Sequence, residues 1–225
     1  MDIIFYGHAC FGIKVNEINI LVDPFITGNP KASNIDLNNI KADYILVTHA
    51  HQDHILDVEL LAEKTGALLV SNFEIVMYFG EKGIKGYPLN HGGTYQTENF
   101  SVKYVNAVHT SSFPDGTYGG QPGGFVISEQ NKSIYIAGDT ALTMDMKLIP
   151  MTTSLEASIL PIGDTFTMGV DDAIIASDFL ECDKVIGCHY NTFPPIEIDE
   201  KKAKQQFSSN GKELLLLEIE DSISL

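Results

Sequence analysis

Apolar residues recur along the chain with the period of a strand in some segments and the period of a helix in others. Strand-like and helix-like segments alternate along the sequence. The segment Phe100–Val108 alternates in part between apolar and polar residues, which is typical of a half-buried antiparallel strand. Tyr44–Val47 and Ile134–Ile136 are nearly continuous apolar runs, which favours strands buried on both faces. We therefore expect strands at Asp2–Tyr6, Cys10–Val15, Ile18–Val22, Tyr44–Thr48, Ala67–Val70, Phe100–Val108, Gly124–Ile127, Ser133–Ala137, Ala157–Leu160, Lys184–Cys188 and Glu213–Ile219.

Several segments between these strands show helical spacing of apolar residues and candidate capping residues, which predicts helices. Asp57 is a candidate N-cap of the first helix and Gly66 lies just past its end, while Asp199 and Gly211 bracket the last helix in the same way. We expect helices at Asp57–Lys64, Phe73–Gly80, Leu142–Met151, Asp171–Leu180 and Asp199–Ser209. Ser111–Pro122 is rich in turn formers and predicts a loop long enough to cover a site. The pattern indicates an α/β (α+β) protein, with two sheets flanked by helices in a single domain, 1–225.

The charge balance excludes some function classes. The formal net charge is −16, from 14 lysines and 30 acidic residues, and arginine is absent. Binding to a nucleic-acid backbone depends on clustered cations that neutralise phosphates, so composition argues against it. No apolar run approaches the roughly 20 residues that span a bilayer. The N-terminus lacks the basic region of a secretory signal, and Cys10, Cys182 and Cys188 follow no disulfide spacing, so we expect a cytoplasmic protein with three buried thiols.

The densest chemical signal is the segment Thr48-His-Ala-His-Gln-Asp-His54, which follows a buried strand. It places the imidazoles of His49, His51 and His54 and the carboxylate of Asp53 within six positions. Packing does not explain this density, because each buried imidazole needs a hydrogen-bond partner. Imidazole and carboxylate suit Zn²⁺ and its first-row neighbours, so the segment predicts a metal site.

This His-x-His-x-Asp-His motif at a strand end resembles the signature of the metallo-β-lactamase superfamily. Further segments, among them Gly7-His-Ala-Cys-Phe11, Leu21-Val-Asp-Pro24, Ala137-Gly-Asp-Thr140 and His189-Tyr-Asn-Thr-Phe-Pro194, are similar to its prokaryotic metal-dependent hydrolase branch, which resembles ascorbate-6-phosphate lactonase and N-acyl-phosphatidylethanolamine phospholipase D. The resemblance covers nearly the full length. It implies a four-layer αβ/βα sandwich, the metallo-β-lactamase fold.

The resemblance also implies a ligand set for two divalent ions. His49, His51 and His109 would hold the first ion, Asp53, His54 and His189 the second, and Asp139 would bridge them. Zinc is the first expectation, with manganese, iron, nickel or cobalt as alternatives. A metal-bridging hydroxide would attack an ester, lactone, amide or phosphodiester of a small or lipid-like substrate. Asp53 is the expected proton handler.

Other residues carry two interpretations each. His8 is a candidate catalytic residue or a satisfied structural histidine, and Asp23 orients a ligand or caps a turn. Thr167, Met168, Tyr190 and Asn191 are candidate substrate contacts, with core filling as the alternative for Met168. We expect His91 to be an exposed loop residue. Ser111 and Ser112 beside His109 form only a weak case for a serine nucleophile.

Two other functions compete with the hydrolase interpretation. A nuclease is the alternative within the same superfamily, and the charge balance opposes it. A non-catalytic metal-binding protein is the alternative from another class, and the complete ligand set opposes it. The sequence leaves open the substrate, the physiological metal and the oligomeric state, including a homo-oligomer.

Overall fold

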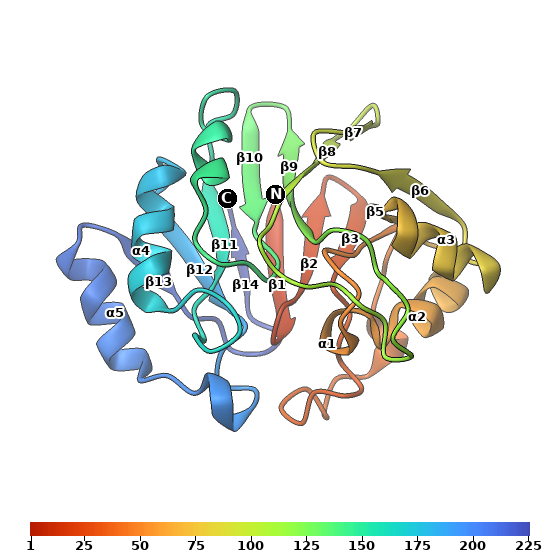
Figure 1. The fold of residues 1–225 in the computed structure, drawn as a ribbon, viewed down its shortest axis with the longest axis horizontal. Helices are drawn as coiled ribbons and strands as arrows, with labels where there is room; N and C mark the ends of the chain where they lie inside the picture. Colours follow the sequence, from red (N-terminus) through yellow and green to blue (C-terminus); the bar gives the residue numbers. More distant parts are fainter.

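Two mixed sheets pack face to face in the computed structural model, which describes residues 1–225, and helices cover their outer faces (Figure 1). In spatial order the first sheet contains β14 (Ser222–Ser224), β1 (Asp2–Gly7), β2 (Cys10–Val15), β3 (Ile18–Val22), β4 (Tyr44–Leu46), β5 (Leu68–Asn72) and β6 (Gly86–Leu89). The second contains β13 (Glu213–Leu215), β12 (Lys184–Cys188), β11 (Ala157–Pro161), β10 (Lys132–Ile136), β9 (Gly123–Glu129), β8 (Ser101–Asn106) and β7 (Thr94–Gln96). This arrangement confirms the expected four-layer sandwich.

Each sheet has an antiparallel part and a parallel part. In the first sheet β3, β4, β5 and β6 run parallel, and in the second β10, β11, β12 and β13 do. The remaining neighbours pair antiparallel. Parallel strands present their carboxyl ends at one edge of a sheet, where α/β proteins place their sites. The segments after β4, β10 and β12 therefore come together at one edge of the molecule.

Helices of the two halves lie on opposite outer faces (Figure 1). The helical segments are η1 (Leu37–Asn39), α1 (Gln52–Ile55), α2 (Val58–Thr65), α3 (Phe73–Glu81), η2 (Met144–Leu148), α4 (Val170–Phe179), η3 (Pro194–Ile196) and α5 (Glu200–Ser209). The core between the sheets contains 21 buried residues drawn from both, and a separate cluster lies between each sheet and its own helices. No helix is long and apolar enough to cross a membrane.

Several local expectations are confirmed. Gly66 ends α2 in the left-handed conformation, with φ of 73°. The Asp199 side chain caps α5 by accepting a hydrogen bond from the backbone N–H of Lys202. Cys10, Cys182 and Cys188 are free and buried, and Cys188 lies in the core between the sheets. Burial raises the pKa of the Cys188 thiol well above its usual value.

Three expectations about elements are corrected. The helix expected at Leu142–Met151 is only the 3-10 segment η2, and Pro150, which has no N–H to donate to a further helical turn, lies two residues beyond its end. The strand expected at Glu213–Ile219 ends at Leu215, and the chain then crosses to the first sheet, where β14 pairs with β1. Asp57 precedes α2 without a side-chain cap, because its carboxylate accepts hydrogen bonds from Ile26 and Thr27 instead.

Candidate metal centre

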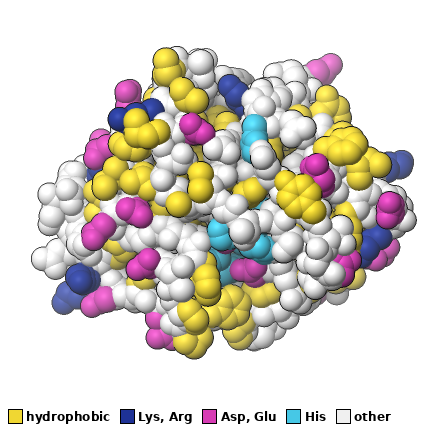
Figure 2. Space-filling model, in the orientation of Figure 1, with side chains coloured by type: hydrophobic (Ala, Val, Ile, Leu, Met, Phe, Trp, Pro, Cys, Tyr) yellow, Lys and Arg dark blue, Asp and Glu magenta, His cyan; other side chains and the backbone are white.

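The seven expected ligands gather at one place although they come from both sheets. His49 and His51 lie between the end of β4 and helix α1, and Asp53 and His54 lie in α1 itself, at the edge of the first sheet. His109, Asp139 and His189 follow β8, β10 and β12 of the second sheet. Figure 2 shows histidine side chains gathered in a hollow near the middle of one face of the molecule. The centre therefore spans the two halves of the sandwich.

One group of ligand atoms comes from three imidazoles. His49, His51 and His109 offer nitrogens that lie within 4.8 Å of one another. Nε2 of His49 is 3.0 Å from Nδ1 of His51. Nitrogens bound tetrahedrally to one zinc at about 2.0–2.1 Å lie roughly 3.3 Å apart, so this spacing fits a shared ion.

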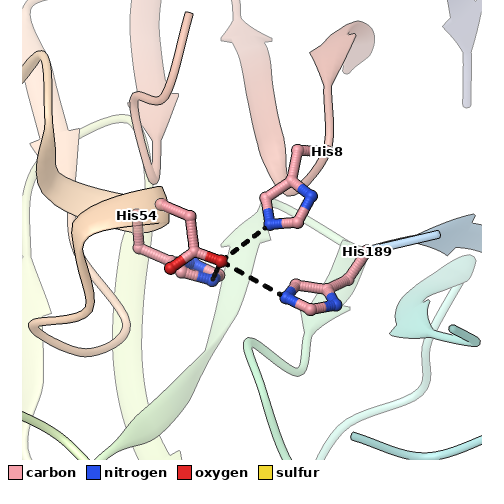
Figure 3. Close-up of side chains that lie close together, drawn as sticks. His8, His54 and His189 are labelled. Atoms are coloured by element: carbon pink, nitrogen blue, oxygen red, sulfur yellow. Dashed lines mark hydrogen bonds and ion pairs between the residues drawn. The ribbon is translucent and has the colours of Figure 1, made fainter. Parts of the chain in front are cut away.

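A second group surrounds the carboxylate of Asp53. Figure 3 shows His8, His54 and His189 converging on one carboxylate. Oδ2 of Asp53 lies 3.0 Å from Nε2 of His8, 3.6 Å from Nε2 of His189 and 3.8 Å from Nε2 of His54. The sequence analysis named His8 as a candidate residue, but it did not predict that His8 would lie among the expected ligands.

Asp139 lies between the two groups. Its Oδ2 is 3.1 Å from Nε2 of His189 and 3.4 Å from Nε2 of His54. The same oxygen is 3.5 Å from Nε2 of His109 and 3.8 Å from Nε2 of His49. The Asp139 carboxylate therefore faces imidazoles of both groups.

Backbone conformation at the strand ends brings these side chains inward. Gly138, directly before Asp139, has φ of 62°, and a Cβ there would lie 2.7 Å from Cβ of Thr48. Only glycine fits this close approach of the two sheets' ligand-bearing segments. His8 and His189 also adopt left-handed backbone, with φ of 58° and 52°, and the N–H of His189 donates to the carbonyl of His8. Such conformations cost free energy and persist where the surroundings hold them.

A network behind the ligands fixes their orientation. The buried carboxylate of Asp23 accepts hydrogen bonds from Nδ1 of His54 at 2.8 Å, and from the N–H and hydroxyl of Thr48 at 2.8 and 2.7 Å. Nδ1 of His8 lies 2.9 Å from the hydroxyl of Thr192, and Nδ1 of His49 lies 3.0 Å from that of Thr48. Thr48 and Thr192 lie within the segments quoted from the sequence, but no pattern identified them as hydrogen-bond partners of the histidines.

The electrostatics of the metal-free protein differ between the two groups. Burial lowers the pKa of His49, His51 and His109, so these imidazoles are neutral and ready to bind. Burial also lowers the pKa of His54 and His189, but the carboxylates around them outweigh it; the pKa of His54 lies well above its usual value and that of His189 is about 9. In turn His189 and His54 hold the pKa of Asp139 well below its ordinary value despite burial.

Unpaired polar atoms test whether a metal fits here. Nε2 of His54 and Oδ1 of Asp139 are buried and have no hydrogen-bond partner in the protein. Buried polar atoms in folded proteins are nearly always paired, so these two call for a further partner. Their neighbours are imidazole nitrogens and carboxylate oxygens, which suit zinc and related divalent ions. The residues present fit a metal.

Residues 2–189 match the β-lactamase superfamily domain. The chain belongs to the metallo-β-lactamase superfamily. It is 63% identical to a UPF0173 metal-dependent hydrolase of Christiangramia forsetii, over 100% of both chains. It is 46% identical to a UPF0173 metal-dependent hydrolase of Thermus thermophilus, over 95% of this chain and 94% of the relative. The solved structure of Igni18, a metallo hydrolase from Ignicoccus hospitalis, has a TM-score of 0.91 at 33% identity and covers 99% of this chain and 97% of its own. The chain is thus a metal-dependent hydrolase whose substrate is unknown.

The candidate substrate contacts of this hydrolase have varied surroundings. Met168 is fully buried in the core beneath α4, in agreement with the core-filling alternative. The amide of Asn191 bonds to the backbone of Ile198 and to Glu200, so it shapes its own loop. Thr167 is half-buried, and its hydroxyl donates to the carbonyl of Met168. Tyr190 is half-buried and lines the same cavity as His8.

Hydrogen bonds decide two further expectations, the exposure of His91 and the weak case for a serine nucleophile beside His109. His91 is half-buried rather than exposed, because its Nε2–H donates to the carbonyl of Pro122 at 2.9 Å and its ring stacks on Tyr104 at 5.0 Å. The Ser111 hydroxyl donates to the carbonyl of Gly119 and accepts from the N–H of Ala50. Ser111 therefore anchors the loop and is not placed as a nucleophile; Ser112 forms an isolated bridge with Tyr118.

Proposed function

We propose that this superfamily member is a dinuclear hydrolase that cleaves an ester, lactone, amide or phosphodiester of a small molecule. In this proposal His49, His51 and His109 hold one ion, Asp53, His54 and His189 hold the other, and Asp139 bridges them. The observation that carries it is the pair of buried, unpaired ligand atoms, Nε2 of His54 and Oδ1 of Asp139, inside a ring of imidazoles. Zinc is the ion that this nitrogen and oxygen set suits best. The three free thiols agree with action in the cytoplasm.

When bound, two divalent ions supply a water of lowered pKa, from about 15.7 towards 7, and polarise the bond under attack. The chain's own residues orient the ligands and handle the proton. Asp23 fixes the His54 ring so that Nε2 faces the centre. Of the two expected ligand carboxylates, Asp53 is the more exposed, with 29% of its side chain accessible, and in this proposal it accepts a proton from the attacking water.

His8 acts beside Asp53 in this proposal. Burial lowers the pKa of His8 to about 4, so the ring is neutral at pH 7. Its Nε2–H donates to Oδ2 of Asp53, and Nδ1 accepts from the Thr192 hydroxyl. This pair of bonds holds the Asp53 carboxylate in one orientation and shares its negative charge, as a positioning residue would.

Metal analysis joined to hydrolysis tests the proposal. Protein purified without added metal is analysed by native mass spectrometry and elemental analysis, then assayed with bis(p-nitrophenyl) phosphate and a panel of lactones. We expect two ions per chain and chelator-sensitive hydrolysis. His109→Gln loses one ion and most activity, whereas the matched control His91→Gln, a histidine bonded to Pro122 outside the centre, keeps both. A wild-type protein that binds a single ion, or hydrolysis that survives complete chelation, contradicts the proposal.

A further inference from the structure

A second cavity lies on the outer face of the second sheet, among residues that the metal centre does not use. Its volume is about 300 Å³, and its apolar lining comes from β8, β9, β10 and the segment around η2, with Val105, Val126, Tyr135, Met146, Leu148 and Ile149. One buried water requires only roughly 10–15 Å³ of such space, whereas small-molecule sites begin at about 300 Å³. The cavity is thus large enough for a small ligand.

Tyr135 lines this cavity, and its buried hydroxyl is a polar group without a partner. The side chain has no exposed surface, and its hydroxyl makes no hydrogen bond within the protein. Its strand neighbours in the same row of the sheet are Val126 and Ser158, and the Ser158 hydroxyl is unpaired as well. A buried tyrosine hydroxyl normally finds a partner, so an acceptor that enters the cavity would complete its bonding.

Lys103 adds a positive charge at the same cavity. It pairs with Val126 across the sheet, is half-buried and forms no ion pair, although the chain has 30 acidic residues against 14 lysines. The acidic residue of the lining, Asp145, is exposed and already accepts a hydrogen bond from Asn106. Apolar side chains of the η2 region, Met144 and Leu148, are 63% and 61% exposed. The cavity therefore combines an apolar lining with one uncompensated cation.

We propose that this cavity binds a medium-chain monocarboxylate, separately from the metal centre. The hydrocarbon chain packs against Val105, Val126 and Met146, and the carboxylate pairs with the ammonium of Lys103 and accepts from Tyr135. None of these residues is an expected ligand. The cavity does adjoin two segments that carry expected ligands. Asn106, in its lining, shortly precedes His109 in the sequence, and η2 shortly follows Asp139. Occupancy there would stabilise the ends of β8 and β10.

Methionine-methyl NMR of metal-loaded protein tests the site directly. Octanoate is titrated into protein labelled at the methionine methyl groups, and Met146 is assigned with Met146→Leu. We expect saturable shifts of the Met146 methyl with a dissociation constant below about 1 mM. Octanol, which has the same chain without the charge, binds about tenfold more weakly. Met168, whose backbone N–H donates to the carbonyl of Thr140 beside Asp139, is the reporter for the metal centre.

Matched variants separate this site from unspecific binding. Lys103→Gln weakens octanoate about tenfold, whereas Lys184→Gln, a second half-buried lysine without an ion pair, leaves it unchanged. Tyr135→Phe retains the ring and weakens octanoate about threefold. Three outcomes overturn the proposal: an unshifted Met146 methyl at about 10 mM octanoate, equal binding of octanol, or shifts confined to Met168. The octanol comparison uses the wild-type protein, so it decides the question even where a variant fails to fold.

Discussion

Asp23 and His54 are joined by a hydrogen bond of 2.8 Å in which Nδ1 of the imidazole donates to a fully buried carboxylate. The bond spans 31 positions of sequence and fixes which ring nitrogen faces the metal centre. Asp23 also accepts from the N–H and hydroxyl of Thr48, directly before the first histidine of the motif. One carboxylate thus contacts both ends of the motif, which agrees with the interpretation that Asp23 orients a ligand; its hydrogen bonds go to Thr48 and His54 and not to the turn before Pro24.

Asp23→Asn is expected to weaken metal binding by about 10–100-fold, because loss of the charge leaves the His54 ring poorly oriented. Chelator competition with zinc measures the affinity. Asp43→Asn is the matched control, since Asp43 accepts comparable hydrogen bonds from Asn19 on the surface. Should Asp23→Asn lower only the melting temperature and leave zinc affinity intact, Asp23 supports the turn and does not tune the ligand.

Metal loading at pH 7 is expected to release roughly two protons from imidazoles, one each from His54 and His189. Carboxylates raise the pKa of both groups, to about 9 for His189, so both are protonated in the metal-free protein at pH 7 and must become neutral to bind. Apparent affinity therefore rises with pH between about 7 and 9. Calorimetry in buffers of different ionisation enthalpy counts the protons, and His189→Gln releases about one fewer. An affinity that is flat over this range would show that the carboxylates do not hold these protons.

His8→Gln is expected to retain both ions and lower kcat about 10–100-fold, because Asp53 keeps its place but loses a fixed hydrogen-bond donor. Elemental analysis and turnover of bis(p-nitrophenyl) phosphate separate the two effects. Thr192→Val removes the hydroxyl beside Nδ1 of His8, and a smaller loss in the same direction is expected. Loss of one ion from His8→Gln would instead make His8 a ligand.

Asn72→Asp is expected to destabilise the fold by about 1–3 kcal/mol. The amide of Asn72 donates to the carbonyls of Gly119 and Gln121 and so anchors the loop Ser111–Pro122. Its Oδ1 caps α3 by accepting from the N–H of Ile75, a role that the aspartate keeps. Urea unfolding measures the free energy, and limited proteolysis reports on the loop.

Asn210→Asp serves as the control for this comparison, because the Asn210 amide donates to the carbonyl of Gln206 on the surface. Its cost should stay within about 0.5 kcal/mol. An equal loss in both variants would mean that the loop contributes nothing through Asn72.

The sequence predicted the parts of this protein that depend on neighbours along the chain. The His49–His54 segment has its proposed ligands within six residues, and apolar strand patterns marked the strands that position the later ones. Contacts between distant segments were not predictable. Thr192 and His8 are 184 positions apart, and His91 meets Pro122 only because a strand edge and a loop fold together. Asp57 has the residue type and position of an N-cap, yet its carboxylate bonds to Ile26 and Thr27.

The division of the proposed ligands between the two sheets has a consequence for assembly of the molecule. His49, His51 and Asp53 belong to one half and His109, Asp139 and His189 to the other, so neither half alone presents a complete coordination shell. In the proposed centre an ion binds residues of both halves, so it stabilises only the state in which the two sheets are packed together. Removal of the metal by a chelator should therefore weaken the packing between the two sheets before either sheet unfolds. Catalytic activity would then report on whether the two sheets are correctly packed.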